Sequence, residues 1–212
     1  METLKEIFTN IYNYNLKNGG LWQSTESVSG TGSTVHETKV IIHEIQLLIE
    51  ELSIKSILDI PCGDFNWMQR VNLDGVHYMG ADIVDSLIAQ NNARYRKSNI
   101  EFHVLDITQD HLPKVDLMIV RDCFGHLSYT DINAALYNIE KAGPRYLLVT
   151  TFTRRGQNES VNRGDWIPLN LMDEPFHLVP LRIINEQCPQ NDGAYADKSL
   201  MLIELQTKIP RY

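Results

Sequence analysis

Short apolar runs alternate with helix-like stretches through most of the chain. The aliphatic runs predict five strands, at about residues 56–60, 77–82, 101–106, 115–120 and 145–151. Helices are expected between them at about 65–71, 84–97 and 130–142, and the last carries apolar residues at the i, i+3, i+4, i+7 spacing. Strands that alternate with helices predict a parallel sheet covered on both faces.

The two ends of the chain depart from this alternation. Helices are predicted over 2–16 and 35–52, with a polar loop rich in Ser, Thr and Gly between them. Two apolar runs near the end, 180–185 and 200–205, have no helix between them and should pair as a hairpin. The expected fold class is an α/β three-layer sandwich with a Rossmann-like, seven-stranded, mostly parallel sheet that ends in this antiparallel C-terminal hairpin.

Length and composition refine this picture. The 212 residues suit a single domain over 1–212, in which 1–34 form an N-terminal helix and capping loop and 152–171 a substrate loop. Nineteen Lys and Arg against 27 Asp and Glu give a net charge of −8, which disfavours nucleic acid as a partner. Three separated cysteines, no apolar run of transmembrane length and no signal-peptide pattern lead us to expect a cytoplasmic protein without a membrane partner.

Acidic residues end the first three predicted strands. Asp59, Asp82 and Asp106 stand one strand–helix unit apart, and ligands of open parallel sheets bind beyond these strand ends. Asp82 suits a ribose diol, because a carboxylate accepts two hydrogen bonds, and Asp106 before Ile107 suits an adenine amino group beside an apolar wall. The loop around Gly63 is expected to open a helix with unpaired N–H groups. The alternative is that each aspartate only caps a turn or helix.

These residues resemble the class I S-adenosylmethionine-dependent methyltransferases. Residues 57–65 look like the first motif in its Asp-x-Pro-Cys-Gly form, Asp82 like the ribose acid, and Asp106–Ile107 like the adenine-side position. The loop Ser29–Ser33 and the segment Gly164–Leu171 are similar to those of a small bacterial-type subset. The resemblance implies S-adenosyl-L-methionine as cofactor, bound by Trp22, Gly30, Gly32, Ser33, Asp59, Pro61, Cys62, Gly63, Asp64, Trp67, Asp82, Ile83, Asp106, Ile107, Arg121 and Asp122.

The fourth strand runs into the segment 121–127, where the resemblance places methyl transfer. The reaction is an in-line displacement, so a hydroxyl acceptor needs a base for its proton. His126 is the candidate base, since a histidine is largely neutral near pH 7; the alternative is a packed loop histidine that contacts the cofactor. Asp122 would orient His126, act as the base itself or bind substrate. Cys123 is not expected to be a nucleophile, because methyl transfer needs no covalent intermediate.

The segment 152–171 is long and lacks core periodicity, as is typical of binding loops. Arg154, Arg155 and Arg163 suggest contact with an anionic group, and Trp166 with a flat apolar face such as a sugar or base; Asp165 completes the substrate set. The alternative is a solvated loop in which Trp166 packs inward. Together with the early loop, this segment is expected to close over the pocket.

The expected function is methyl transfer from S-adenosyl-L-methionine to oxygen or nitrogen of a small polar acceptor, anionic or glycan-related acceptors included. The alternatives are a nucleic-acid or protein methyltransferase and a non-catalytic scaffold that binds the cofactor. The histidines and cysteines show no zinc-binding spacing, so no metal site is expected; the alternative is a divalent cation held by Asp122 and Asp165, as in some methyltransferases of this fold. The sequence leaves the acceptor and the oligomeric state open.

Overall fold

The computed structural model describes residues 2–18 and 26–205. The chain divides into two compact units, Met1–Asp106 and Ile107–Tyr212, and each is described by itself. The expectation of a single domain over 1–212 therefore stays a prediction. Trp22 lies outside the described residues.

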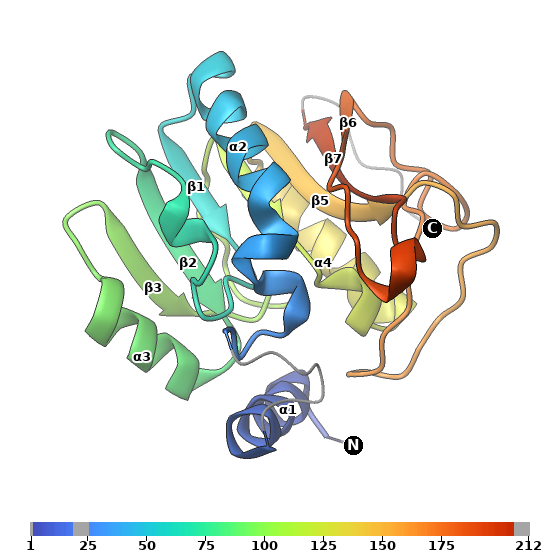
Figure 1. Ribbon diagram of the computed structural model, residues 1–212, viewed down its shortest axis with the longest axis horizontal. Coiled ribbons are helices and arrows are strands. Elements are labelled where there is room, and N and C mark those ends of the chain that lie inside the picture. Colours follow the sequence, from blue (N-terminus) through green and yellow to red (C-terminus); the bar gives the residue numbers. More distant parts are fainter. Residues whose placement is uncertain (1, 19–25, 206–212) are drawn as a thin grey trace. The chain divides into compact units, whose positions relative to one another are not determined.

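In its described residues, the first unit contains three parallel strands and three α-helices (Figure 1). Strands β1 (Ser56–Asp59), β2 (His77–Asp82) and β3 (Ile100–Val104) stand in the order β3-β2-β1. The helices are α1 (Leu4–Asn18), α2 (Val35–Glu51) and α3 (Asp85–Tyr95). The Thr34 hydroxyl caps α2 by accepting a hydrogen bond from the Glu37 N–H, which satisfies a backbone donor at the helix start. The predicted helices over 2–16, 35–52 and 84–97 are confirmed to within a few residues.

The helix predicted at 65–71 is wrong. After β1 the chain forms a loop with only a three-residue 3-10 turn, Met68–Arg70. Gly63 and Phe65 have φ values of 54° and 59°, which a right-handed helix cannot accommodate. The Phe65 ring instead packs against the rings of Tyr78, Tyr95 and Phe102, so the apolar residues here serve the core without forming a helix. The expected helix N-terminus beside Gly63 does not exist either.

The second unit contains the other four described strands and one helix. Strands β4 (Leu117–Val120), β5 (Tyr146–Phe152), β6 (Arg182–Asn185) and β7 (Lys198–Glu204) stand in the order β4-β5-β7-β6. β4 and β5 are parallel, whereas β7 is antiparallel to both β5 and β6. Helix α4 (Tyr129–Ala142) begins after Ser128, whose hydroxyl accepts the Asp131 N–H, and ends at Gly143 in the left-handed conformation. The antiparallel C-terminal hairpin is confirmed.

The fold class is confirmed in the described residues: a seven-stranded mixed sheet, mostly parallel with an antiparallel C-terminal pair, together with helices. Strands β1, β4 and β5 are buried along almost their whole length, as expected for strands covered on both faces. Within residues 2–18 and 26–205, none of the helices has the length and apolar character needed to cross a bilayer.

Candidate functional site

Asp82 ends β2 and lies at the centre of the first unit's polar contacts. Its Oδ2 accepts the Gly63 N–H at 3.3 Å and its Oδ1 accepts the Val84 N–H at 3.1 Å. These bonds fix the carboxylate and leave further lone pairs on both oxygens. Burial raises the pKa of Asp82 to about 6, although the Val84, Gly63 and Ile83 N–H groups lower it. The geometry therefore presents a pinned carboxylate suited to a pair of hydroxyl groups.

Asp59, at the end of β1, has a different environment. Its carboxylate is 1% exposed, and its Oδ2 accepts a 2.8 Å hydrogen bond from the hydroxyl of Tyr78, a residue with no exposed surface. Desolvation, followed by the charge of Asp59, raises the pKa of Tyr78. The pair joins β1 to β2 inside the core, so the contacts of Asp59 are structural.

We expect Tyr78→Phe to lower the free energy of unfolding by about 2 kcal/mol. The change removes a donor from a buried carboxylate, and a buried group that loses its partner costs about 1–3 kcal/mol. Tyr137→Phe, on the exposed face of α4, is the matched control and should change nothing, because Tyr137 is 54% exposed. Urea unfolding of both variants measures the effect. Equal stabilities would contradict a structural role for the Tyr78–Asp59 bond.

The polar loop before α2 is fastened to the loop after β1. The Asp64 carboxylate accepts the Ser27 hydroxyl and the Val28 N–H, each at 3.0 Å, and the Asp64 N–H donates to Ser29 Oγ at 2.9 Å. A Cβ added at Gly63 would stand 2.4 Å from Ser29 Oγ, so only glycine allows this close approach. The motif around Gly63 and the Ser-Gly loop, which are far apart in sequence, thus meet as expected.

The other residues predicted for the cofactor in the first unit take varied positions. Gly30 has a φ of 97° and leads into the 3-10 turn Thr31–Ser33, which contains Gly32. Cys62 and Trp67 are buried, and burial raises the pKa of the Cys62 thiol. The buried Asp106 lies two residues beyond β3 and closes the first unit, whereas Ile107 begins the second. Pro61 follows the end of β1 and is partly exposed.

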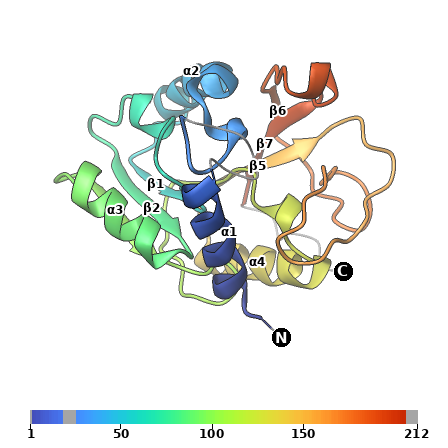
Figure 2. The same cartoon turned by 60° about the horizontal axis from the view of Figure 1, so that its bottom comes forward.

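Helix α1 forms one wall of this region, which the sequence did not predict. Tyr12 packs in an apolar cluster with Val84 and Leu87, and Phe8, Val28 and Ile83 lie against it. Lys5 pairs with Asp85 at 2.7 Å, so α1 lies beside the start of α3 (Figure 2). A nearby cavity of about 260 Å³ is lined by residues that include Ser27, Asp64, Gln90 and Asn91. Ile83 lies against the apolar cluster, which suits its side chain to form an apolar wall for a ligand.

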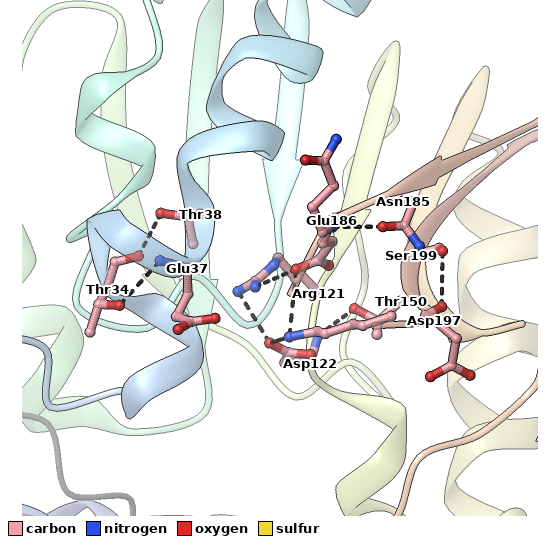
Figure 3. Close-up of polar contacts among 12 residues, drawn as sticks. Thr34, Glu37, Thr38, Arg121, Asp122, Thr150, Asn185, Glu186, Asp197 and Ser199 are labelled. Atoms are coloured by element: carbon pink, nitrogen blue, oxygen red, sulfur yellow. Dashed lines mark hydrogen bonds and ion pairs between the residues drawn. The ribbon is translucent and has the colours of Figure 1, made fainter. Parts of the chain in front are cut away.

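In the second unit, Arg121 and Asp122 follow β4 directly. Asp122 has a φ of 52°, and its N–H donates to the Thr150 hydroxyl on β5 at 2.9 Å. Its carboxylate pairs with Arg121 and with Lys198, and Glu186 pairs with Arg121 (Figure 3). The sequence analysis missed Glu186 and Lys198. Each of these two charged residues lies beside one of the apolar runs predicted at 180–185 and 200–205, and that position was the signal for them in the sequence.

His126 lies in the 3-10 turn Phe124–His126 after β4. Its Nδ1 is 3.0 Å from the Asp165 carbonyl oxygen, and since a carbonyl only accepts, Nδ1 carries the proton of the neutral ring. The lone pair that a base needs is then on Nε2. Desolvation lowers the pKa of His126, although the charge of Asp122 and the carbonyls of Asp165 and Gly164 oppose it. The imidazole is therefore neutral at pH 7. Cys123 precedes this turn and is partly exposed.

The loop 152–171 is held by its own contacts. Arg163 makes a bidentate ion pair with Asp131 at the start of α4, at 2.6 and 2.8 Å. Arg155 donates to the Ala194 carbonyl and lies over the rings of Phe152 and Tyr195. Two of the three arginines predicted to bind an anion thus already have protein partners.

The remaining substrate candidates differ in exposure. Arg154 and Asp165 are exposed, and the Asn162 amide donates to the Asp165 carboxylate. Trp166 packs edge-on against Phe152 and Tyr195, with centroids 5.9 and 5.2 Å apart, and is partly exposed. The Asn158 amide donates to the Asn170 carbonyl and fixes the loop at its far end. Among the described residues, no group of three or more His, Cys, Asp and Glu is placed to hold a metal ion.

Part of this sequence is similar to a known protein family. Residues 57–142, from β1 to the end of α4, match the family model described as a methyltransferase domain. This segment is similar to a methyltransferase domain. No curated protein matches the chain. The matched segment includes the loop after β1, Asp82, Asp122 and His126.

Solved structures of several methyltransferases share the fold of this chain. Human N-acetylserotonin methyltransferase, in complex with SAM, is 15% identical with a TM-score of 0.60, and the match covers 96% of this chain and 60% of that one. Magnesium protoporphyrin IX methyltransferase from Synechocystis, with bound SAH, is 14% identical (TM-score 0.51; 70% and 73% covered). The N-methyltransferase NodS from Bradyrhizobium japonicum, in complex with SAH, is 18% identical (TM-score 0.50; 68% and 72% covered). The chain thus spans about three fifths of the length of the human enzyme.

Proposed function

We propose that this protein is a methyltransferase that transfers the methyl group of S-adenosylmethionine to oxygen or nitrogen of a small polar acceptor. The observation that carries the proposal is the Asp82 carboxylate, pinned by the Gly63 and Val84 N–H groups at the end of β2. A carboxylate at this place in an open α/β sheet is suited to a ribose diol. The relatives crystallised with SAM or SAH have the same fold.

In the first unit, the proposed cofactor contacts are Asp82, the Gly63 backbone and the apolar side chain of Ile83. Asp82 accepts hydrogen bonds from the ribose hydroxyls, and the tight turn at Gly63 lets the backbone approach the ligand. Ile83 packs against the base. Asp59 supports this rim from within, through Tyr78.

In the second unit, the proposed acceptor contacts are His126, Asp122 and the exposed Arg154. His126 is neutral and takes the proton that a hydroxyl acceptor loses. Arg154 is the one arginine of the predicted three whose side chain is exposed, and it suits an anionic group on the acceptor. Arg155 and Arg163 order the loop that carries them.

Isothermal titration calorimetry with S-adenosylhomocysteine is the first test, and saturable 1:1 binding is the expected result. Radiolabelled methyl transfer from S-adenosylmethionine to fractionated small metabolites then identifies the acceptor. Absence of binding would favour a non-catalytic scaffold, and label in protein or nucleic acid would favour the macromolecular alternative.

A further inference from the structure

Four charged side chains, those of Arg121, Asp122, Glu186 and Lys198, meet where β4 ends and β7 begins, and Figure 3 labels the first three. Arg121, Glu186 and Lys198 have side chains only 4%, 1% and 6% exposed, whereas that of Asp122 is 28% exposed. Two cations and two anions give the cluster no net charge. Asp122 is thus the member of the cluster that reaches the surface.

The contacts of Asp122 are concentrated on one of its oxygens. Lys198 Nζ lies 2.6 Å and an Arg121 amino nitrogen 3.1 Å from the same atom, Oδ2. In the part of the chain that the structure describes, Oδ1 has no hydrogen-bond donor. The Asp122 N–H is tied to Thr150, so backbone and carboxylate are both fixed. Oδ1 remains available to a ligand.

Glu186 supports the two cations from the buried side. Its Oε2 lies 2.7 Å from the Arg121 guanidinium and 3.6 Å from Lys198 Nζ, and its Oε1 is buried without a hydrogen-bond partner among the described residues. Burying several charges, one with an unmatched oxygen, costs free energy that well-packed apolar residues would not. Stability therefore does not account for this cluster, and a role in holding Asp122 does.

We propose that Lys198 and Glu186 are positioning residues for ligand binding by Asp122. With Arg121 they hold its carboxylate in one orientation, so that Oδ1 accepts a hydrogen bond from an N–H or O–H group at the site of methyl transfer. The ligand class is a nitrogen or oxygen nucleophile that still carries its proton. The inference rests on the proposed function and adds to it two residues that bind neither cofactor nor acceptor.

This arrangement separates the roles of Asp122 and His126. The charged and titratable groups that face Asp122 are Arg121 beside it, Lys198 on β7 and the neutral His126 after β4, with Glu186 behind the cations. Although burial raises it, the pKa of Asp122 is lowered to about 2 by Arg121 and Lys198. A carboxylate this acidic is a poor proton acceptor at pH 7 but a strong hydrogen-bond acceptor. Asp122 therefore orients the nucleophile, and the proton goes to His126.

Sinefungin is the probe for this proposal, because it carries an ammonium group in place of the methylsulfonium centre. Its affinity relative to that of S-adenosylhomocysteine reports a hydrogen-bond acceptor at the site of methyl transfer. Calorimetry measures both dissociation constants for the full chain, for Asp122→Asn, Lys198→Met, Lys198→Arg and Glu186→Gln, and for the control Lys141→Met on the exposed end of α4.

We expect Asp122→Asn and Lys198→Met to weaken sinefungin binding about tenfold more than they weaken S-adenosylhomocysteine binding. Glu186→Gln should likewise lower the ratio of the sinefungin affinity to the S-adenosylhomocysteine affinity. Lys198→Arg should restore it, and Lys141→Met should match the wild type. Retained S-adenosylhomocysteine binding also shows that each variant is folded.

Two results would overturn the inference and leave the proposed function intact. If Asp122→Asn keeps the wild-type ratio, Asp122 does not face the ligand. If Asp122→Asn lowers the ratio but Lys198→Met and Glu186→Gln do not, Asp122 needs no positioning. If neither analogue binds the wild-type protein, the proposed function itself fails.

Discussion

Replacement of His126 by alanine is expected to slow methyl transfer to a hydroxyl acceptor by a factor of about 10²–10⁴, the usual contribution of a general base. The imidazole is held by the Asp165 carbonyl with its lone pair on Nε2, which alanine cannot replace. Initial rates with the acceptor found in the radiolabel assay measure the effect, and the affinity for S-adenosylhomocysteine should stay the same. His111→Ala, an exposed histidine of the same unit, is the matched control.

The pH dependence of the same reaction should show that the pKa of His126 is lowered. Because burial lowers the pKa of His126, the ring is neutral through pH 7 and becomes protonated only below its ordinary value of 6.5. The rate should therefore be flat near neutral pH and fall on the acidic side, and His126→Ala should lose that acidic limb. Full turnover by His126→Ala would leave His126 a packing residue, the alternative that the sequence had left open.

Replacement of Asp82 by alanine is expected to raise the dissociation constant for S-adenosylhomocysteine by about 10- to 100-fold. The ribose hydroxyls would lose a charged acceptor, a loss of about 1–3 kcal/mol. Asp74→Ala, at an exposed position before β2 in the same unit, is the matched control and should bind normally. An unchanged dissociation constant for Asp82→Ala would remove this residue from the proposed site.

The raised pKa of Asp82 gives a second check, because binding and stability should respond to pH in opposite directions. As the pH falls through about 6, Asp82 takes up a proton in the folded protein, and its carboxylate loses acceptor capacity for the ribose. In the unfolded chain the same group stays ionised to about pH 4. Over this window Asp82 should therefore increase the free energy of unfolding while weakening cofactor binding. Asp82→Asn should remove both responses.

The periodicity of apolar residues was enough to predict most elements of the fold. The strands from β1 to β7 and the C-terminal hairpin follow from local aliphatic content, because burial on both faces of a strand requires it. The helix predicted at 65–71 failed, since Phe65 takes a left-handed conformation to reach the rings of Tyr78 and Phe102. Packing contacts with residues outside the segment cannot be recognised from the sequence of the segment itself.

For the candidate site as well, the sequence predicted some features and the tertiary structure decided the others. The sequence by itself determined the fold class and the aspartates at the strand ends, because strand periodicity and the position of a residue at a strand end are local properties of the chain. Only the tertiary structure decided the partners of each aspartate: Asp59 Oδ2 accepts the Tyr78 hydroxyl, whereas the Asp82 carboxylate is held in place by backbone N–H groups. It also decided that Arg163 forms an ion pair with Asp131, that Lys198 pairs with Asp122, and that Glu186 pairs with Arg121. Those pairings join residues 32 to 76 positions apart, and charge pairing at that separation depends on packing that no local pattern encodes.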